Sequence, residues 1–196
     1  MNSLQIVKAM KAGDRTGFDQ LYQEYHLILY RTAYLLLGNP HDAEDVLQET
    51  FVSAYLNIGN LKDEEKLKSW LFSILKHTAY RQGKKRNKEW PDQHILLKVD
   101  SLDKEENGEE NFALKNEIKE CLMNLKPKFR EVIVLYYYND LTIEEIAQIC
   151  GSFQGTIKSR LHKARKELKK ELEKADMEYM SYEREGIHEK TLESRI

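Results

Sequence analysis

The chain has 196 residues, a hydrophobic fraction of 41% and a formal net charge of −2 at pH 7. This length allows one domain or two small ones, and the apolar content is sufficient for packed cores. Only three prolines and nine glycines, with few Val-rich alternating runs, predict an almost wholly helical protein. The net charge alone argues against a nucleic-acid-binding protein, but it is the sum of separate basic and acidic segments.

The first residues, MNSLQIVKAMKAGD, lack the apolar segment and cleavage site of a signal peptide. The longest apolar run, LILYRTAYLLL, is too short to span a bilayer and contains Arg31. Cys121 and Cys150 have no CxxC or Cys/His spacing, so buried reduced thiols are expected rather than a disulfide or a metal site. We therefore expect a cytoplasmic protein without membrane insertion.

The first half of the chain predicts a helical unit. Helical periodicity runs from about Ser3 to Leu37, and a second helix begins at Asp42. The apolar stripe expected to be buried on the second helix is Ala43, Val46, Leu47, Phe51, Ala54, Tyr55 and Ile58. The residues expected to face outward are Glu44, Asp45, Gln48, Glu49 and Val52. A third helix begins near Ser69 and ends in a basic cluster, and Trp70 and Phe72 are interpreted as core residues.

Two basic segments, residues 76–88 and residues 158–170, flank an acidic one. Residues 76–88 contain several Lys and Arg and no acidic residue, whereas residues 100–110 are almost entirely acidic among their charged positions. Residues 89–111 lack helical periodicity and predict a flexible linker, whose r.m.s. span as a coil would be about 25–30 Å. Such a linker would let two small domains reach separate sites on one partner.

The second half of the chain contains a predicted helix-turn-helix. A helix reaches Leu125, Pro127 starts the next one, and Thr142 with Glu145 forms a capping box for the first helix of the motif. Gly151 and Gly155 bound the turn. The second helix of the motif has apolar residues at positions 157, 161, 164, 168 and 172 and cations on its other face. A solvated surface helix would show the same charges, but cations that directly follow a capped helix and a turn favour binding in a DNA major groove.

Two strings, DAEDVLQETF and GTIKSRLHKAR, identify a family when they occur together in this order. With their flanking segments they resemble regions 2 and 4 of the extracytoplasmic-function (ECF) sigma factors, over nearly all of residues 14–173. The resemblance implies an all-α fold of two small helical domains, residues 1–88 and 112–174, joined by the flexible acidic linker 89–111. Residues 175–196 form a polar tail without an assigned role.

The resemblance also implies a function and its residues. An alternative sigma subunit has no enzymatic activity or cofactor of its own, and it gives core RNA polymerase promoter recognition and strand opening. The residues implied for polymerase binding are Glu44, Asp45, Gln48 and Glu49. Those implied for the −10 element are Asn60, Lys62, Lys66, Lys76, His77, Tyr80, Arg81, Lys84, Lys85 and Arg86. Those implied for the −35 element are Ser152, Gln154, Thr156, Lys158, Ser159, Arg160, Lys163 and Arg165.

Within these sets, Arg160 is the candidate for pairing with a guanine edge, and Lys158, Lys163 and Arg165 are candidates for phosphate contacts. His77 stands where the family usually has Asn, and Arg81 stands where it often has Asp, so the −10 base preference stays open. The expected partners are core RNA polymerase, promoter DNA and an anti-sigma protein, without a small-molecule substrate.

Two other classes of function compete with this interpretation. A stand-alone helix-turn-helix regulator accounts for residues 127–172 but leaves DAEDVLQETF and the first basic cluster without a role. A metal-dependent enzyme could use His41, Asp42, Glu44, Asp45 and Glu49, but ligands normally converge from further elements, and no HExxH or P-loop pattern occurs.

Overall fold

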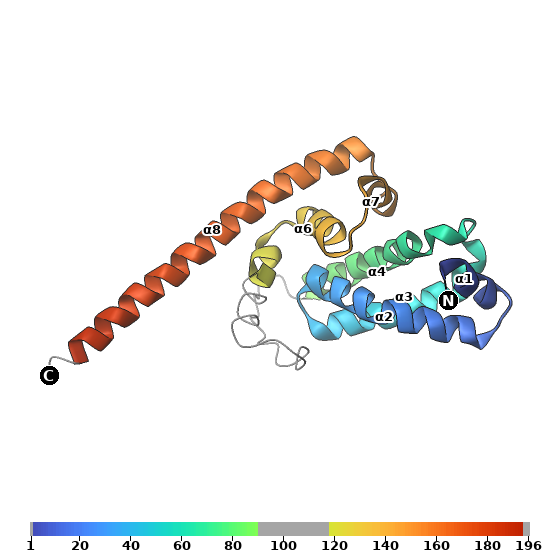
Figure 1. Ribbon diagram of the computed structural model, residues 1–196, viewed down its shortest axis with the longest axis horizontal. Coiled ribbons are helices and arrows are strands. Elements are labelled where there is room, and N and C mark those ends of the chain that lie inside the picture. Colours follow the sequence, from blue (N-terminus) through green and yellow to red (C-terminus); the bar gives the residue numbers. More distant parts are fainter. Residues whose placement is uncertain (1, 90–117, 194–196) are drawn as a thin grey trace.

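A computed structural model of the chain describes the backbone of residues 2–89 and 118–193, and the side chains of residues 2–84 and 118–175. Within these ranges the protein consists of helices and connecting turns without any strand (Figure 1). The all-α prediction is therefore confirmed. Apart from Glu89, which ends a helix, the predicted linker 89–111 lies outside the described residues.

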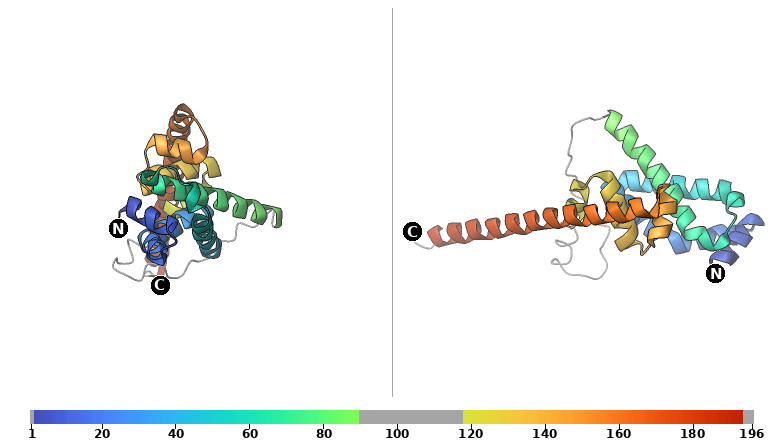
Figure 2. Two further views of the ribbon diagram at one scale, coloured as in Figure 1. Left: turned by 90° about the vertical axis from the view of Figure 1, so that its right-hand side faces the viewer. Right: turned by 90° about the horizontal axis from the view of Figure 1, so that it is seen from above.

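The N-terminal unit contains four α-helices. They are α1 (Ser3–Lys11), α2 (Arg15–Leu37), α3 (Pro40–Asn57) and α4 (Leu67–Glu89), with short 3-10 turns η1 (Ile58–Asn60) and η2 (Glu64–Lys66) between α3 and α4. Helix α2 packs against α1, α3 and α4, and α3 packs against α4. In both views of Figure 2 the last turns of α4, which carry the predicted basic cluster, project away from the other helices.

Polar side chains fix where the first three helices begin. Asn2 and Gln5 form a capping box on α1, and Asp14 accepts the Thr16 backbone N–H at the start of α2. Helix α3 begins with Pro40 and is capped by Asn39, so it starts two residues before the predicted Asp42. Gly38 ends α2 with φ of 74°, a left-handed conformation that glycine adopts without strain.

The core of the N-terminal unit follows the predicted stripes with one exception. Leu21, Leu29 and Phe72 are fully buried, and Trp70 packs half-buried against the same cluster. Tyr55 was expected in the buried stripe of α3, but that prediction is wrong because 59% of its surface is exposed. Its ring lies at the edge of the core, where it packs edge-on against Phe18 with 5.7 Å between ring centroids.

The C-terminal unit begins in the described residues with a helical segment at 118–124. Helix α6 (Pro127–Ile133) continues into a π-helical turn, η3 (Val134–Tyr138), which is followed by α7 (Ile143–Cys150) and α8 (Gln154–Glu193). Helix α8 packs on α6 and α7 near its start. Its 40 residues correspond to about 60 Å at 1.5 Å per residue, and the helix extends far beyond the rest of the fold (Figure 1).

The two units pack against each other. Helix α7 contacts α4, and α6 and η3 contact α2. The two halves of the chain were expected to be joined by a flexible connector and to reach separate sites, whereas in this structure they share a buried boundary. Because that boundary involves residues predicted to bind DNA, its contacts are part of the functional site.

Candidate nucleic-acid and protein interfaces

The helix-turn-helix forms as its local sequence predicts. Thr142 Oγ1 accepts the Glu145 backbone N–H at 3.2 Å, and the Glu145 carboxylate accepts the Thr142 backbone N–H at 2.8 Å. Gly151 then ends α7 in the left-handed region with φ of 57°. This capping box and glycine stop hold α7 to eight residues and turn the chain sharply into α8.

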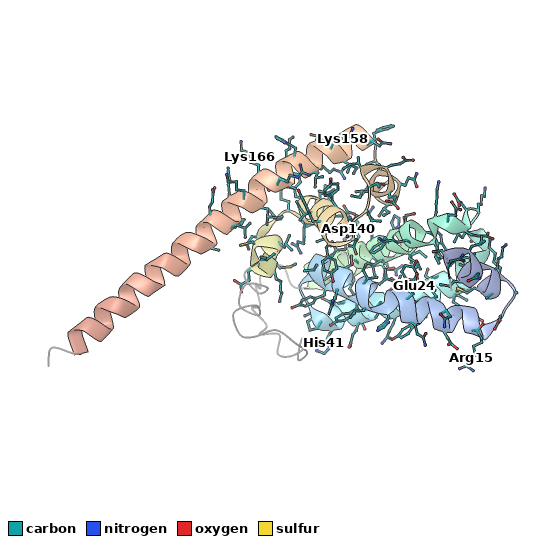
Figure 3. The ribbon with its side chains drawn as sticks, in the orientation of Figure 1. Arg15, Glu24, His41, Asp140, Lys158 and Lys166 are labelled. Atoms are coloured by element: carbon teal, nitrogen blue, oxygen red, sulfur yellow. The ribbon has the colours of Figure 1, made fainter. Side chains whose placement is uncertain are left out.

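One face of α8 is buried and the opposite face carries the predicted −35 residues. Ile157, Leu161 and Ala164 are buried in the core of the C-terminal unit. Lys158 and Lys166 project from the outer side of α8, away from α6 (Figure 3). Exposed −35 candidates are Gln154, Thr156, Lys158, Ser159, Lys163 and Arg165, whereas Ser152 and Arg160 are half-buried. An exposed cationic surface beside a packed stripe is the shape required for docking into a major groove.

Arg165 contacts aromatic rings of the same unit. Its guanidinium carbon lies 5.6 Å from the Tyr136 ring centroid and 5.4 Å from that of Tyr137. Cation–π contacts at these distances orient an arginine without neutralising it. The three tyrosines 136–138 range from half-buried to exposed, in agreement with their interpretation as boundary residues.

The predicted −10 residues follow η1, the loop after it and the exposed side of α4. Asn60, Lys62, Lys66, His77, Tyr80, Arg81 and Lys84 are exposed, whereas Lys76 is half-buried. The side chains of Lys85 and Arg86 lie outside the described residues. Tyr80 is 62% exposed, and the Lys84 ammonium lies 4.9 Å from its ring centroid. An exposed ring flanked by cations can stack on an unpaired base while the cations contact phosphates.

The predicted polymerase-binding residues share the outer side of α3. Glu44, Asp45, Gln48 and Glu49 are all exposed, which confirms that they face outward. The surface continues into apolar side chains, because Val52 is 57% and Leu56 is 72% exposed. An acidic surface next to exposed aliphatic residues combines charge complementarity with apolar contact area, as protein interfaces do.

Arg81 of α4 forms an ion pair with Glu49 of α3. One partner was assigned to DNA and the other to polymerase, so the structure places the two predicted surfaces side by side. Both side chains are about half exposed, and such a pair contributes little to stability. Its main effect is to fix the direction of the guanidinium.

Another ion pair lies on the boundary between the two units. Lys76 Nζ of α4 is 3.9 Å from a Glu131 carboxylate oxygen of α6, with only 21% and 15% of the side chains exposed. Burial together with Glu131 raises the pKa of the neighbouring Cys150 thiol to about 12. Cys121 is buried and Cys150 half-buried, which agrees with the expected reduced thiols.

Asn139, which the sequence did not single out, connects both units. Its side chain is 1% exposed, its Oδ1 lies 3.0 Å from the Thr32 hydroxyl of α2, and its Nδ2 donates to the Val134 carbonyl at 3.1 Å. Its own backbone carbonyl accepts from Lys68 Nζ of α4 at 2.9 Å. All three bonds are buried or partly buried, and the two that cross the boundary, from Thr32 and from Lys68, favour one way of docking the units.

Arg130 of α6, which the sequence also did not single out, caps the C-terminal ends of two helices. Its guanidinium donates to the Leu36 carbonyl of α2 at 2.7 Å and to the Met123 carbonyl at 2.9 Å. Carbonyls in the last turn of a helix lack intrahelical partners, and a cation is favourable there. Burial lowers the pKa of Arg130 to about 10, which leaves it charged at neutral pH.

The described residues contain no group of three or more His, Cys, Asp or Glu side chains arranged to hold a metal ion. No helix within the same residues has the length and apolar character needed to cross a membrane.

Comparisons with known proteins match both halves of the chain. The family model for sigma-70 region 2 matches residues 21–89, and that for sigma-70 region 4 matches residues 115–168. The region 2 match covers the half that a stand-alone helix-turn-helix regulator leaves without a role.

Relatives match along most of their length. The chain is 31% identical over 179 residues to the ECF RNA polymerase sigma factor SigW of Bacillus subtilis, an alignment that covers 85% of this chain and 94% of SigW. It is 33% identical over 156 residues to SigM of the same organism, covering 77% and 92% of the two chains.

Solved structures agree with these relatives. The sigma factor RpoE of Bartonella quintana, in complex with the anti-sigma factor NepR, superimposes with a TM-score of 0.67 at 30% identity, covering 80% of this chain and 96% of RpoE. CnrH, in complex with the cytosolic domain of CnrY, has the same fold, with a TM-score of 0.68 at 20% identity and coverage of 87% and 97%. The chain therefore belongs to the ECF group of the sigma-70 family, the alternative sigma subunits that direct RNA polymerase to promoters.

Proposed function

We propose that this sigma subunit divides its work among three surfaces: the outer side of α3 binds core RNA polymerase, α4 with the preceding loop binds the −10 element, and α8 binds the −35 element. The observation that carries the proposal concerns two of these surfaces. The residues predicted to bind polymerase and most of those predicted to bind the −35 element are exposed, and they lie on opposite halves of one sigma fold. The acidic residues lie on α3 and the cationic ones lie on α8.

The α3 surface is suited to a basic partner. Glu44, Asp45 and Glu49 supply negative charge, and Val52 and Leu56 supply apolar area that is costly to leave in water. Charge complementarity sets the choice of partner and the rate of encounter, and the apolar residues add area that becomes buried on docking. We therefore extend the proposed polymerase surface from the four polar residues to Val52 and Leu56.

The −10 surface is proposed to capture bases after strand opening. Tyr80 offers an exposed ring for stacking, and Lys84 and Arg81 are close enough along α4 to contact the flanking phosphates. His77 is exposed and its Nδ1 lies 2.7 Å from the Ser73 carbonyl, so its other ring nitrogen is the atom proposed to contact a base edge. His77 and Tyr80 are thus the proposed base contacts.

The −35 surface is proposed to read duplex DNA. The first turns of α8 enter the major groove, where Arg160 can pair with a guanine and Lys158 and Lys163 can bind phosphates. Arg160 is half-buried, which limits the number of its conformations before DNA arrives. Lys158 and Lys163 are exposed and unrestricted by comparison.

DNA binding and the packing of the two units compete for Lys76. In the docked state its ammonium pairs with Glu131, so a phosphate contact through Lys76 requires the pair to break. We propose that the docked arrangement is a resting state and that polymerase binding separates the units. RpoE was solved in complex with the anti-sigma factor NepR. We propose a partner of the same kind for this chain, which would bind the exposed α3 surface in place of polymerase.

Co-elution of the purified full chain with bacterial core RNA polymerase on a sizing column tests the function. We expect stoichiometric co-elution for the natural chain and about tenfold weaker binding for Asp45→Arg with Glu49→Arg, because like charges then face the basic partner. Asp45→Arg alone separates this effect from loss of the Glu49–Arg81 pair. Glu24→Arg, an exposed charge reversal on α2, serves as the control and should co-elute normally.

Unchanged co-elution of the double variant would contradict the assignment of α3. A natural chain that elutes alone but still retards DNA would instead point to a regulator that acts without polymerase.

A further inference from the structure

Phe153 stands out in the turn that leads into α8. It is 85% exposed, the highest value among the large apolar side chains of the described residues. Among the side chains that the structure describes, no aromatic ring packs against it, and it lies outside the hydrophobic core and the residues packed against that core. Single exposed apolar side chains are common on protein surfaces, so the exposure of Phe153 acquires meaning from its position in the fold.

Phe153 also occupies a position where another residue type would stabilise the helix. Its carbonyl accepts the backbone N–H groups of Thr156 at 2.9 Å and of Ile157 at 3.1 Å, which defines it as the N-cap of α8. Ser, Thr, Asp and Asn are preferred there because their side chains accept a free N–H of the first turn. Phe cannot do so, and the adjacent Ser152 hydroxyl instead bonds to the Cys150 carbonyl at 3.4 Å.

A second departure from helix preference lies two residues away. Gly155 sits in the first turn of α8, and a Cβ built on it would meet nothing within 4 Å. Its φ is not in the left-handed region either, so neither packing nor backbone conformation within the described residues requires glycine. Glycine in a helix lowers stability relative to alanine. Its position beside Phe153 is consistent with close approach of an external surface to this turn.

The surroundings indicate what that surface is. Gln154, Thr156, Lys158 and Ser159 are all exposed around Phe153, and Lys158 projects outward at the corner between α7 and α8 (Figure 3). A cation next to a lone apolar ring, on the end of the helix that enters the groove, matches a polyanion that displays isolated apolar groups. In the major groove of DNA the only such group is the C5-methyl of thymine.

We propose that Phe153 reads a thymine in the −35 element through an apolar contact with its C5-methyl group. This inference rests on the proposed −35 function of α8 and adds one base-specific position to it. It also explains both departures from helix preference: the N-cap is given up for a base contact, and Gly155 lets the DNA approach the turn.

The test uses holoenzyme reconstituted from the full chain and bacterial core RNA polymerase. Promoter duplexes are selected from a random DNA pool, and each thymine of the selected −35 element is then replaced by deoxyuridine, which lacks only the methyl group. We expect one replacement to weaken binding about fourfold, the ratio that corresponds to about 0.8 kcal/mol for one buried methyl group. Phe153→Ala should bind the natural duplex more weakly and lose sensitivity to that replacement.

Two further variants separate recognition from folding. Phe153→Ser supplies the missing cap, so it should raise the thermal midpoint by about 2–4 °C while it lowers −35 affinity. Loss of affinity with gain of stability cannot result from misfolding. Leu4→Ser, a substitution of another exposed apolar residue on α1, should leave DNA affinity and methyl dependence unchanged.

The outcomes separate a failure of the Phe153 inference from a failure of the proposed sigma function on which it rests. A chain that forms no holoenzyme, or a holoenzyme that selects no DNA, overturns the proposed function and this inference with it. A holoenzyme that selects a −35 element but shows no methyl effect, or an equal methyl effect in Phe153→Ala, overturns the inference alone. If Phe153→Ala changes only the binding of a protein partner, the ring belongs to a protein interface instead.

Discussion

Replacing Asn139 with alanine tests whether the two units are docked as the structure shows. The side chain makes one hydrogen bond across the boundary, to Thr32, and one within its own unit, to the Val134 carbonyl. At about 1 kcal/mol each, their loss should lower the free energy of unfolding by about 2 kcal/mol.

The structure places this figure near the lower end of the range for buried polar deletions. The Thr32 hydroxyl keeps a bond to the Ile28 carbonyl at 2.7 Å, and the Val134 carbonyl keeps the Asn139 backbone N–H at 3.2 Å. No buried group is left without a partner, so the additional penalty for an unsatisfied donor or acceptor does not apply.

The assay is urea denaturation followed by far-ultraviolet circular dichroism. Thr32→Val removes the bond across the boundary and also the bond of the hydroxyl to the Ile28 carbonyl within α2. The second loss occurs with and without Asn139→Ala, so a double-mutant cycle cancels it and isolates the Thr32–Asn139 bond, for which we expect a coupling of about 1 kcal/mol. Asn57→Ala is the matched control, because Asn57 makes an exposed bond to the Ser53 carbonyl, and its effect should stay within about 0.5 kcal/mol. A coupling below about 0.3 kcal/mol would refute the docked arrangement.

Three further predictions concern the C-terminal unit. Arg160→Ala should relax −35 sequence specificity, whereas Lys163→Ala should weaken binding to all duplexes alike and lower the salt slope by about one; equal losses on matched and scrambled duplexes for Arg160→Ala would contradict its role. In a Cys121→Ala background, Cys150 should react with iodoacetamide at pH 8 about 10³-fold more slowly than in the unfolded chain, because its pKa of about 12 leaves little thiolate. A rate equal to that of the unfolded chain would show that the thiol is not buried. Thr142→Ala should cost about 1 kcal/mol of stability and Thr142→Ser almost none, as measured by thermal unfolding; equal stability of the two would mean that the capping box does not operate.

Local signals in the sequence predicted the helix-turn-helix well. A capping box needs only residues three apart, and a glycine stop needs one residue, so Thr142, Glu145 and Gly151 were readable without tertiary information. Helical periodicity likewise predicted which side of α3 is exposed. It failed for Tyr55 because periodicity gives an angle around the helix, whereas burial at the edge of a stripe depends on what the neighbouring helix covers.

The start of α3 shows a smaller limit of the same kind. The acidic residues of DAEDVLQETF indicated a helix N-terminus at Asp42, but the side chain that accepts the free N–H belongs to Asn39. An N-cap acts through a single hydrogen bond, and several residues near a Gly-Asn-Pro sequence are able to make it. The sequence therefore predicted the helix but not the residue at which it begins.

The sequence by itself determined the fold class, the order of the helices and the chemical character of each exposed face, because these follow from propensity, capping and periodicity over a few residues. Only the tertiary structure paired Arg81 with Glu49 and Lys76 with Glu131, and only it buried Asn139 against Thr32. These pairs join residues far apart in the chain, and their geometry is set by how whole helices dock. No local pattern encodes that docking, since it is the sum of many weak packing contacts made at once.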